Sequence, residues 1–180
     1  MSTTPQETRR RIDDPGRLSA VRATGLLDTP AEEPFDRLAR LAATTLDAPL
    51  AFVTVVDDRR SFWKACIGVD ARDPADRQNP VEESFCQYVV GLDAELVVGD
   101  AAGDPRTQDN PSIAAMGVAA WAGFPPRSPE GEVVGSFCVV DTRVRTWSDH
   151  DVEVLRTLAH AFSGATAQDD VAILVLRVED

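Results

Sequence analysis

Cysteine and histidine are scarce in this sequence of 180 residues, and their spacing excludes two common uses. The three cysteines, Cys66, Cys86 and Cys138, are odd in number, and none lies close to another. A disulfide framework needs an even, regularly spaced set, so we expect reduced thiols. No cysteine pair has the spacing of zinc ligands, and the two histidines, His150 and His160, both fall in one predicted late helix. We therefore expect no metal site.

The sequence also lacks an excess of basic residues and any long apolar run. Its 18 lysines and arginines are outnumbered by 30 aspartates and glutamates, which gives a formal net charge of -12. Nucleic acids and anionic membranes both attract basic surfaces, so neither is an expected partner. With no signal-peptide pattern and no membrane-spanning run, we expect a cytoplasmic protein. At 43% hydrophobic residues, the chain can form one buried core.

The clearest strand signal is the apolar, β-branched run at residues 133–141. A proline and a glycine at turn spacing precede it within 128–131, which predicts a hairpin with the apolar run at 121–125. Residues 51–58 have the same character and the same acidic end. The two long runs together predict the centre of a sheet.

Helix signals flank these strands, which favours an α+β class with a central antiparallel sheet. A helix is expected from Arg17 to Gly25, and a second from a cap at Thr29, with an apolar stripe that runs to Leu46. A last helix is expected at 148–161. The remaining predictions are strands at 61–68 and 95–100, short helices at 84–90 and near 110–112, and a surface loop at 69–82.

Taken in order, these motifs resemble the GAF domain of bacterial signalling proteins over about residues 17–164. The resemblance depends on the number and order of the motifs, because no single one is specific. They are Arg17-Leu18 with Gly25-Leu26-Leu27-Asp28-Thr29-Pro30, Phe35-Asp36-Arg37-Leu38, Val55-Val56-Asp57 with Phe62-Trp63-Lys64 and Gly68, Ser84-Phe85-Cys86, Asp100-Ala101 with Asp104-Pro105-Arg106, Asn110-Pro111, Trp121-Ala122-Gly123-Phe124-Pro125, and Gly135-Ser136-Phe137-Cys138-Val139-Val140-Asp141-Thr142.

The resemblance implies a sheet of about six antiparallel strands, with helices on one face and a small-molecule pocket on the other. It implies a sensory and regulatory module in signal transduction that is not itself catalytic and has a signalling-protein partner. It also implies homodimerisation through the terminal helices, which the apolar stripes at 17–27 and 148–162 favour as well. The chain is thereby divided into a disordered or helical lead at 1–16, a GAF domain at 17–164 and a tail at 165–180.

Aromatic and polar residues in the sheet-and-loop half of the chain are the candidates for the implied pocket. The loop at 69–82 and the helix start at Ser84 would close this pocket against Trp121. The predicted ligand-binding residues are Phe62, Trp63, Phe85, Cys86, Tyr88, Asp100, Asp104, Arg106, Trp121 and Phe124. The alternative is that the aromatic residues only form the core, which would leave a protein-interaction module without a ligand.

Cys86 has two interpretations. Close behind Ser84 at a helix start, its pKa could be lowered, which would make it a redox sensor. An unpaired cysteine is more often a small buried apolar residue, and we favour that interpretation. Among cofactors, a covalent bilin is disfavoured because Gln87, and not a histidine, follows Cys86, and haem is disfavoured because neither histidine falls near the expected pocket. The identity of any ligand or cofactor is unknown from the sequence.

The last residues carry a second, shorter resemblance. Residues 169–177 are similar to the last strand of the metal-dependent serine/threonine phosphatases of the sporulation stage II type, in which an Asp-Asp pair supplies a metal ligand. The rest of such a catalytic domain has no room between Gly164 and Asp169, so phosphatase activity is not expected. Two interpretations stay open: a truncated derivative of a GAF-linked phosphatase, and an acidic cap before an ordinary edge strand.

Overall fold

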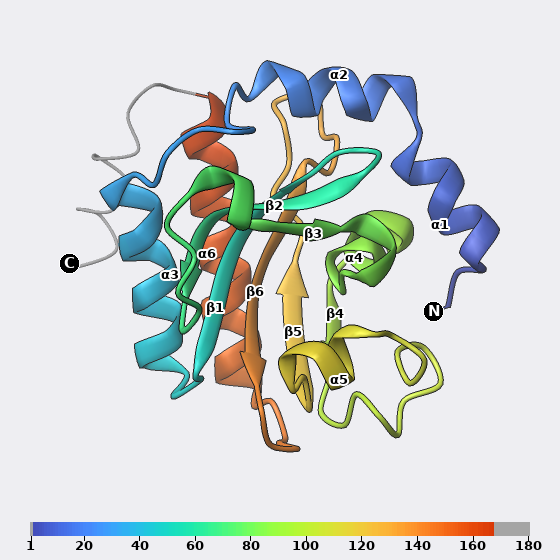
Figure 1. Ribbon diagram of the computed structural model, residues 1–180, viewed down its shortest axis with the longest axis vertical. Coiled ribbons are helices and arrows are strands. Elements are labelled where there is room, and N and C mark those ends of the chain that lie inside the picture. The colour runs from blue at the N-terminus through green and yellow to red at the C-terminus, as the bar shows by residue number, and fades with distance from the viewer. Residues whose placement is uncertain (1, 168–180) are drawn as a thin grey trace.

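The structure, a computed structural model, describes residues 2–167. A single sheet with helices on both faces forms the molecule (Figure 1). The elements in chain order are α1 (Pro5–Ile12), α2 (Pro15–Ala23), α3 (Glu33–Thr45), β1 (Leu50–Val56), β2 (Arg60–Ile67), a 3-10 turn (Pro74–Asp76), β3 (Gln78–Pro80), a 3-10 turn (Val81–Glu83), α4 (Cys86–Leu92), β4 (Leu96–Val98), α5 (Ser112–Met116), β5 (Ala120–Phe124), β6 (Gly135–Asp141) and α6 (Asp149–Ala167).

The sheet has six strands in the order β3-β2-β1-β6-β5-β4, and all neighbours are antiparallel. The two runs predicted to form its centre, β1 and β6, are the two middle strands, and every residue in both is buried. Their register places Phe52 opposite Cys138 and Val53 opposite Phe137. Because side chains alternate along a strand, the first pair faces one side of the sheet and the second pair faces the other. The predicted GAF-like α+β fold is confirmed.

Different helices cover the two faces of the sheet. One face packs against α3 and α6; in Figure 1, α6 passes behind the sheet and α3 lies to the left of β1. The rings of Phe35 and Phe162 meet edge to face there at 5.6 Å. The other face packs against α4 and α5, with Phe52, Trp121 and Cys138 in its core. The expected pocket face therefore carries short helices of its own.

The lead forms a helix. Thr4 caps α1 in a capping box with Glu7, and Thr8 and Ile12 on the inner side of α1 are buried against α4. Arg17 of α2 is buried, and its guanidinium donates to the carbonyl oxygens of residues 11, 12, 56, 57 and 133. One cation thus joins the N-terminal helices to the loops that end β1 and precede β6.

The predicted cap of α3 at Thr29 is wrong by three residues, because Glu32 occupies the cap position and the helix begins at Glu33. Thr29 does not cap the helix; its hydroxyl donates to the carbonyl oxygen of Leu26 and accepts from Lys64 Nζ at 2.7 Å. Lys64 is fully buried and also holds Pro30 O and the carboxylate of Glu32, the residue before the first turn of α3. A long-range contact from β2, invisible in the local pattern, thereby holds residues 29–32 outside the helix.

The predicted surface loop at 69–82 is also partly wrong, because it contains β3, the sixth strand. β3 pairs with the first residues of β2, and Arg77 and Val81 on either side of it are buried. Three residues are too few for a period-two pattern, and the segment is rich in proline and charge, so no strand signal is present there in the sequence. Within the described part of the chain, no helix is both long and apolar enough to span a membrane.

Candidate functional site

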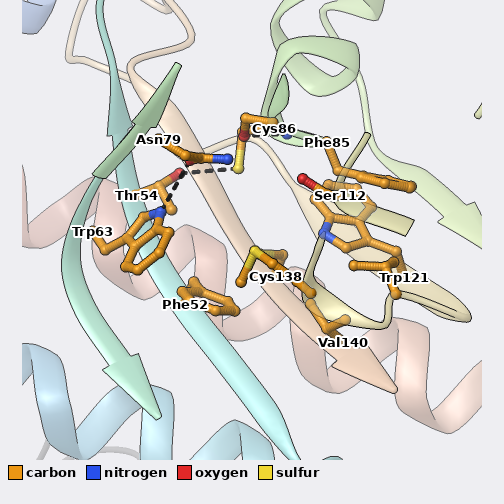
Figure 2. Close-up of a pocket in the computed structure, with 13 residues that line it drawn as sticks. Phe52, Thr54, Trp63, Asn79, Phe85, Cys86, Ser112, Trp121, Cys138 and Val140 are labelled. Carbon is orange, nitrogen blue, oxygen red and sulfur yellow. Dashed lines mark hydrogen bonds between the residues drawn. The ribbon is translucent and has the colours of Figure 1, made fainter. Parts of the chain in front are cut away.

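An aromatic cavity lies between the sheet and the starts of α4 and α5 (Figure 2). Its volume is about 40 Å³. The residues that line it are Phe52, Thr54, Trp63, Asn79, Ser84, Phe85, Cys86, Ser112, Met116, Val118, Trp121, Cys138 and Val140. This space suits one or a few water-sized molecules, because one water occupies roughly 30 Å³ in the liquid.

Large side chains occupy most of the space between the sheet and these helices. The rings of Phe85 and Trp121 lie 5.6 Å apart, and the rings of Phe52 and Trp63 meet at 5.3 Å. The Trp121 indole folds over Gly123 on its own strand, where an added Cβ would lie 2.1 Å from the ring. Trp121 is buried, so it acts as a core residue in this conformation.

Two thiols face this cavity from opposite sides. Cys86 opens α4 and Cys138 lies in the middle of β6, and both are buried. The hydroxyl of Thr54 donates to Cys86 Sγ at 3.4 Å, and the Cys86 amide donates to the Ser84 hydroxyl at 3.1 Å. Hydrogen bonding from the Cys138 thiol, and then from Ser84 and Thr54, lowers the pKa of Cys86 to about 6 despite its burial.

A larger cavity, of about 380 Å³, lies on the outer side of α4. It is bounded by α1, by α4 and by the loop at 105–111. The residues that line it are Ser2, Thr3, Pro5, Thr8, Glu82, Gln87, Tyr88, Leu92, Leu96, Pro105, Arg106, Asp109, Asn110 and Pro111. Its volume falls within the range of roughly 300–1,000 Å³ that is usual for small-molecule sites.

Polar side chains in this outer cavity are held in place by their neighbours. Asn110 Nδ2 donates to the phenol oxygen of Tyr88 at 3.1 Å, and burial raises the pKa of that phenol. Asp104 accepts from Nε and Nη2 of Arg106 at 2.9 and 2.6 Å, and this pairing lowers the pKa of the Asp104 carboxyl. Since Asp104 engages neither hydrogen of Nη1, that nitrogen is the part of Arg106 available to a ligand.

The model of one protein family, the GAF domain, matches residues 30–165, which is most of the chain. The chain belongs to the GAF domain family. The resemblance read from the sequence motifs is therefore confirmed. The short phosphatase-like stretch at 169–177 lies outside the described residues.

A cyclic di-GMP phosphodiesterase of Pseudomonas aeruginosa is similar to this GAF domain, with 33% identity over 149 residues. The match covers 82% of the chain and 24% of the relative. The chain thus spans about a quarter of the length of the curated relative that it matches.

Solved GAF domains share the fold at low sequence identity. The GAF domain of a phosphoenolpyruvate-protein phosphotransferase from Coxiella burnetii matches with a TM-score of 0.63 and 15% identity, over 91% of this chain and 97% of that one. The corresponding domain from Acinetobacter gives 0.61 and 16%, over 89% and 98%. At these identities the likeness establishes the fold alone.

The ten predicted ligand-binding residues do not form one site. The aromatic cavity contains Trp63, Phe85, Cys86 and Trp121, and the outer cavity contains Tyr88 and Arg106. Asp104 reaches the outer cavity only through its ion pair with Arg106. The other three lie elsewhere: Asp100 caps its own turn by accepting from the Gly103 amide, Phe124 packs against α3 and α6, and Phe62 lies under the guanidinium of Arg60.

Phe62 is absent from the aromatic cavity because of a bulge. The β1–β2 register shifts between Val53 and Thr54, so that Thr54 lies opposite Trp63 and Val55 opposite Phe62. Trp63 thereby shares the cavity face with Thr54, and Phe62 points to the other face. A run of aromatic residues in the sequence does not reveal where such a shift occurs.

Several cavity residues were not predicted from the sequence. Phe52 and Cys138 have a period-two signal, since each lies two residues from another cavity-facing position of its strand, Thr54 or Val140. Asn79 and Asn110 have no such signal. Asn79 accepts from Trp63 Nε1 at 3.3 Å from within the segment predicted to be a loop, so only the tertiary fold brings it to the site.

Proposed function

We propose that this GAF domain is a regulatory module of signal transduction that binds a small polar or zwitterionic molecule in the outer cavity. The observation that carries the proposal is the contrast between the two cavities, about 380 Å³ outside α4 and about 40 Å³ inside. Of these two cavities, the larger one has room for a metabolite without a rearrangement of the core.

The lining of the outer cavity supports a ligand that carries charges of both signs. Arg106 offers a guanidinium nitrogen, and Asp109 and Glu82 offer carboxylates. Glu82 already pairs with Arg9 of α1 at 3.1 Å, so Asp109 is the carboxylate that is more available to a ligand. One arginine is a poor match for a dinucleotide with several phosphates, but it suits a single carboxylate or phosphate.

Helix α1 gives such a site a means of communication. It packs on α4, and Thr8 contacts Gly91 so closely that an added Cβ at Gly91 would lie 2.5 Å from the Thr8 hydroxyl. A ligand between α1, α4 and the loop at 105–111 would bind best to one position of α1. Differential binding of this kind shifts a population of conformers, which is how an occupied site changes a distant partner.

The proposed output is the regulation of a separate catalytic partner. A relative of this domain is named as a cyclic di-GMP phosphodiesterase, and the matched region is 24% of that protein. We propose that this domain regulates the activity of a signalling enzyme. We also propose that the domain catalyses no reaction of its own.

Homodimerisation is part of the proposal, with a contact surface that differs from the expected one. Leu155 and Leu158 of α6 are packed in the core, so the apolar stripe of that helix serves the fold. The outer face of α6 exposes Glu153, Arg156 and His160. Within one copy, Glu153 and Arg156 already pair at 2.6 Å. Two copies related by a twofold axis, with α6 helices antiparallel, would exchange this pair for contacts between Glu153 of one copy and Arg156 of the other.

A second candidate is a protein-interaction module without a ligand. The specific observation in its favour is that Trp63, Phe85 and Trp121 occupy the interior next to the sheet, where the sequence had predicted a ligand. Ligand-binding measurements on the outer cavity separate the two candidates.

The test is calorimetry and thermal shift with a panel of amino acids, mononucleotides, cyclic nucleotides and cyclic di-GMP. We expect saturable binding of a small molecule that carries one anionic group, weakened at least tenfold by Arg106→Gln. Arg72→Gln is the matched control, because it makes the same change of charge at a residue whose side chain is 92% exposed and remote from the cavity.

Equal affinity of the Arg106→Gln and Arg72→Gln variants would move the binding site elsewhere. Absence of binding across the whole panel would favour the interaction module. Binding of cyclic di-GMP in preference to single-phosphate ligands would contradict the proposed ligand class.

A further inference from the structure

The thiol pair at the aromatic cavity has no part in the proposed ligand site. Cys86 and Cys138 come from α4 and β6 and are 5% and 2% exposed. Figure 2 shows their sulfur atoms directed into the same small space between the sheet and α4. The third cysteine, Cys66 of β2, is half-buried and does not line this cavity.

Two buried hydroxyl groups adjoin the thiols. Ser61 Oγ and Ser136 Oγ are buried and have no hydrogen-bond partner at ordinary distance. The Ser61 hydroxyl lies beside Cys86 and contributes to its lowered pKa, and the Ser136 hydroxyl lies beside Cys138. A buried hydroxyl without a hydrogen-bond partner costs free energy. A thiolate on the neighbouring cysteine would accept a hydrogen bond from such a hydroxyl and remove that cost.

The two thiols are chemically unequal. The pKa of Cys86 is lowered to about 6, whereas burial, and then the interaction with Cys86, raises the pKa of Cys138 well above its usual value. Of the two, Cys86 is therefore the thiol that loses its proton more readily. The thiolate is the nucleophilic form of cysteine.

We propose that Cys86 and Cys138 form a peroxide-reactive dithiol that closes to a disulfide between α4 and β6. The Cys86 thiolate attacks one oxygen of hydrogen peroxide, the O–O bond breaks, and the released hydroxide takes up a proton to become water. Cys86 is then a sulfenic acid. The sulfur of Cys138 loses its proton and attacks Cys86 Sγ, an S–S bond forms, the S–O bond breaks, and the second oxygen leaves as water.

The cavity selects the oxidant. At about 40 Å³ it accepts a water-sized molecule, and hydrogen peroxide is only slightly larger than water. A tripeptide disulfide such as oxidised glutathione does not fit. The site is therefore specific for small peroxide, and thiol–disulfide exchange with large partners should be slow.

The experiment is peroxide titration of the wild-type chain and of the Cys66→Ser, Cys86→Ser and Cys138→Ser variants under anaerobic conditions, with free thiols counted and disulfides mapped by mass spectrometry. We expect the wild type to lose two thiols and two mass units, with a Cys86–Cys138 peptide link. Cys66→Ser, the matched control, should lose the same two thiols. Cys138→Ser should stop at a sulfenic acid on Cys86, seen as the gain of the mass of one oxygen atom on the Cys86 peptide.

Oxidised glutathione at the same concentration should react at least tenfold more slowly than peroxide. The wild-type map decides the proposal even if a serine variant fails to fold. Oxidation confined to Cys66, an intermolecular disulfide, or survival of both Cys86 and Cys138 as thiols under excess peroxide would overturn it. So would equal reaction rates with peroxide and oxidised glutathione.

Discussion

Two buried arginines, Arg17 and Arg77, show that the hydrogen-bond partners around a side chain decide how much it contributes to stability. Arg17 donates to five carbonyl oxygens, the shortest of these bonds to Val56 O at 2.7 Å. Arg77 makes one side-chain hydrogen bond, from Nη2 to Lys64 O, while its Nε and Nη1 have no hydrogen-bond partner at ordinary distance, although the Asp36 carboxylate and the Cys66 thiol lie near enough to interact with it. Burial of an unpaired cationic group is costly, whereas a fully bonded one stabilises the loops around it.

We therefore expect Arg17→Met to lower the free energy of unfolding by about 3–5 kcal/mol, because several buried carbonyls lose their donor. Arg77→Met should cost less than about 1.5 kcal/mol, since it removes an under-satisfied charge. Urea denaturation of both variants measures this, with the exposed Arg22→Met as control on the same helix as Arg17. A larger loss for Arg77→Met than for Arg17→Met would contradict the argument.

The Cys86 thiol predicts a dependence of stability on pH. Its pKa in the folded chain is about 6, below the usual thiol value near 9. A lowered pKa adds stability that is complete above the unfolded value and is lost as the pH falls through the folded value. The free energy of unfolding should therefore rise between pH 6 and 9 in the wild type and not in Cys86→Ser.

Thiolate absorbance near 240 nm gives an independent readout, with an expected midpoint close to pH 6 that disappears in Cys86→Ser. Cys66→Ser should retain it, because burial raises the pKa of Cys66. A wild-type midpoint above pH 8 would show that Cys86 is an ordinary buried thiol.

At the scale of elements, the start of α3 depends on β2. Lys64 Nζ reaches Thr29 Oγ1, Pro30 O and the carboxylate of Glu32 and lies 5.2 Å from the centre of the Phe35 ring. The first backbone hydrogen bonds of α3 run from Phe35 and Asp36 to Glu32 O. The Lys64 side chain thus connects β2 to the start of α3 and to the segment between α2 and α3.

Lys64→Met should lower the free energy of unfolding by about 2–4 kcal/mol, because the Thr29 hydroxyl and the Pro30 carbonyl lose their donor and the Glu32 carboxylate loses its partner. Amide exchange at Phe35 and Asp36 should become faster than that of the middle of α3. Glu32→Gln, which keeps a hydrogen-bond acceptor, serves as the milder control. Unchanged exchange at both amides would show that α3 begins at Glu33 for local reasons.

At the scale of the molecule, the described surface exposes little that is apolar. Val144, at 64%, is the single large hydrophobic residue exposed among the described residues. The apolar stripes that favoured a dimer in the sequence are used by the sheet, so the predicted homodimer must depend on polar contacts.

Light scattering at tens of micromolar chain should give the mass of a dimer at low salt and a smaller average mass at high salt, because screening weakens contacts between exposed charges. Arg156→Glu should weaken the dimer, and Arg72→Glu, far from α6, should not. Leu155→Glu is unsuitable, because Leu155 is buried in the core. A monomer mass at every salt concentration would contradict the prediction.

The whole chain should hydrolyse no p-nitrophenyl phosphate with Mn²⁺ or Mg²⁺, because two-metal hydrolysis needs a set of carboxylates that a short Asp-Asp stretch cannot supply. Steady-state assays with each metal check this. Metal-dependent turnover that is lost in Asp170→Ala would contradict it.

The sequence by itself determined the central strands, the class of fold and the family. Residues 51–58 and 133–141 are long and apolar on both faces, so they could only be the middle of a covered sheet. The GAF motifs occur in a fixed order along the chain, and this order can be recognised without any tertiary contact. Apolar runs and motifs are properties of neighbouring residues in the chain, so they can be recognised from the sequence alone.

Tertiary structure alone decided the start of α3, the sixth strand and the division of the predicted pocket. Lys64 reaches Thr29 from another element, and β3 needs β2 beside it because three residues cannot form a strand alone. A bulge after Val53 turned Phe62 away from the cavity, and the Trp121 ring filled the space over Gly123. Each outcome depends on which side chain occupies a shared volume, and that is fixed only when distant segments pack together.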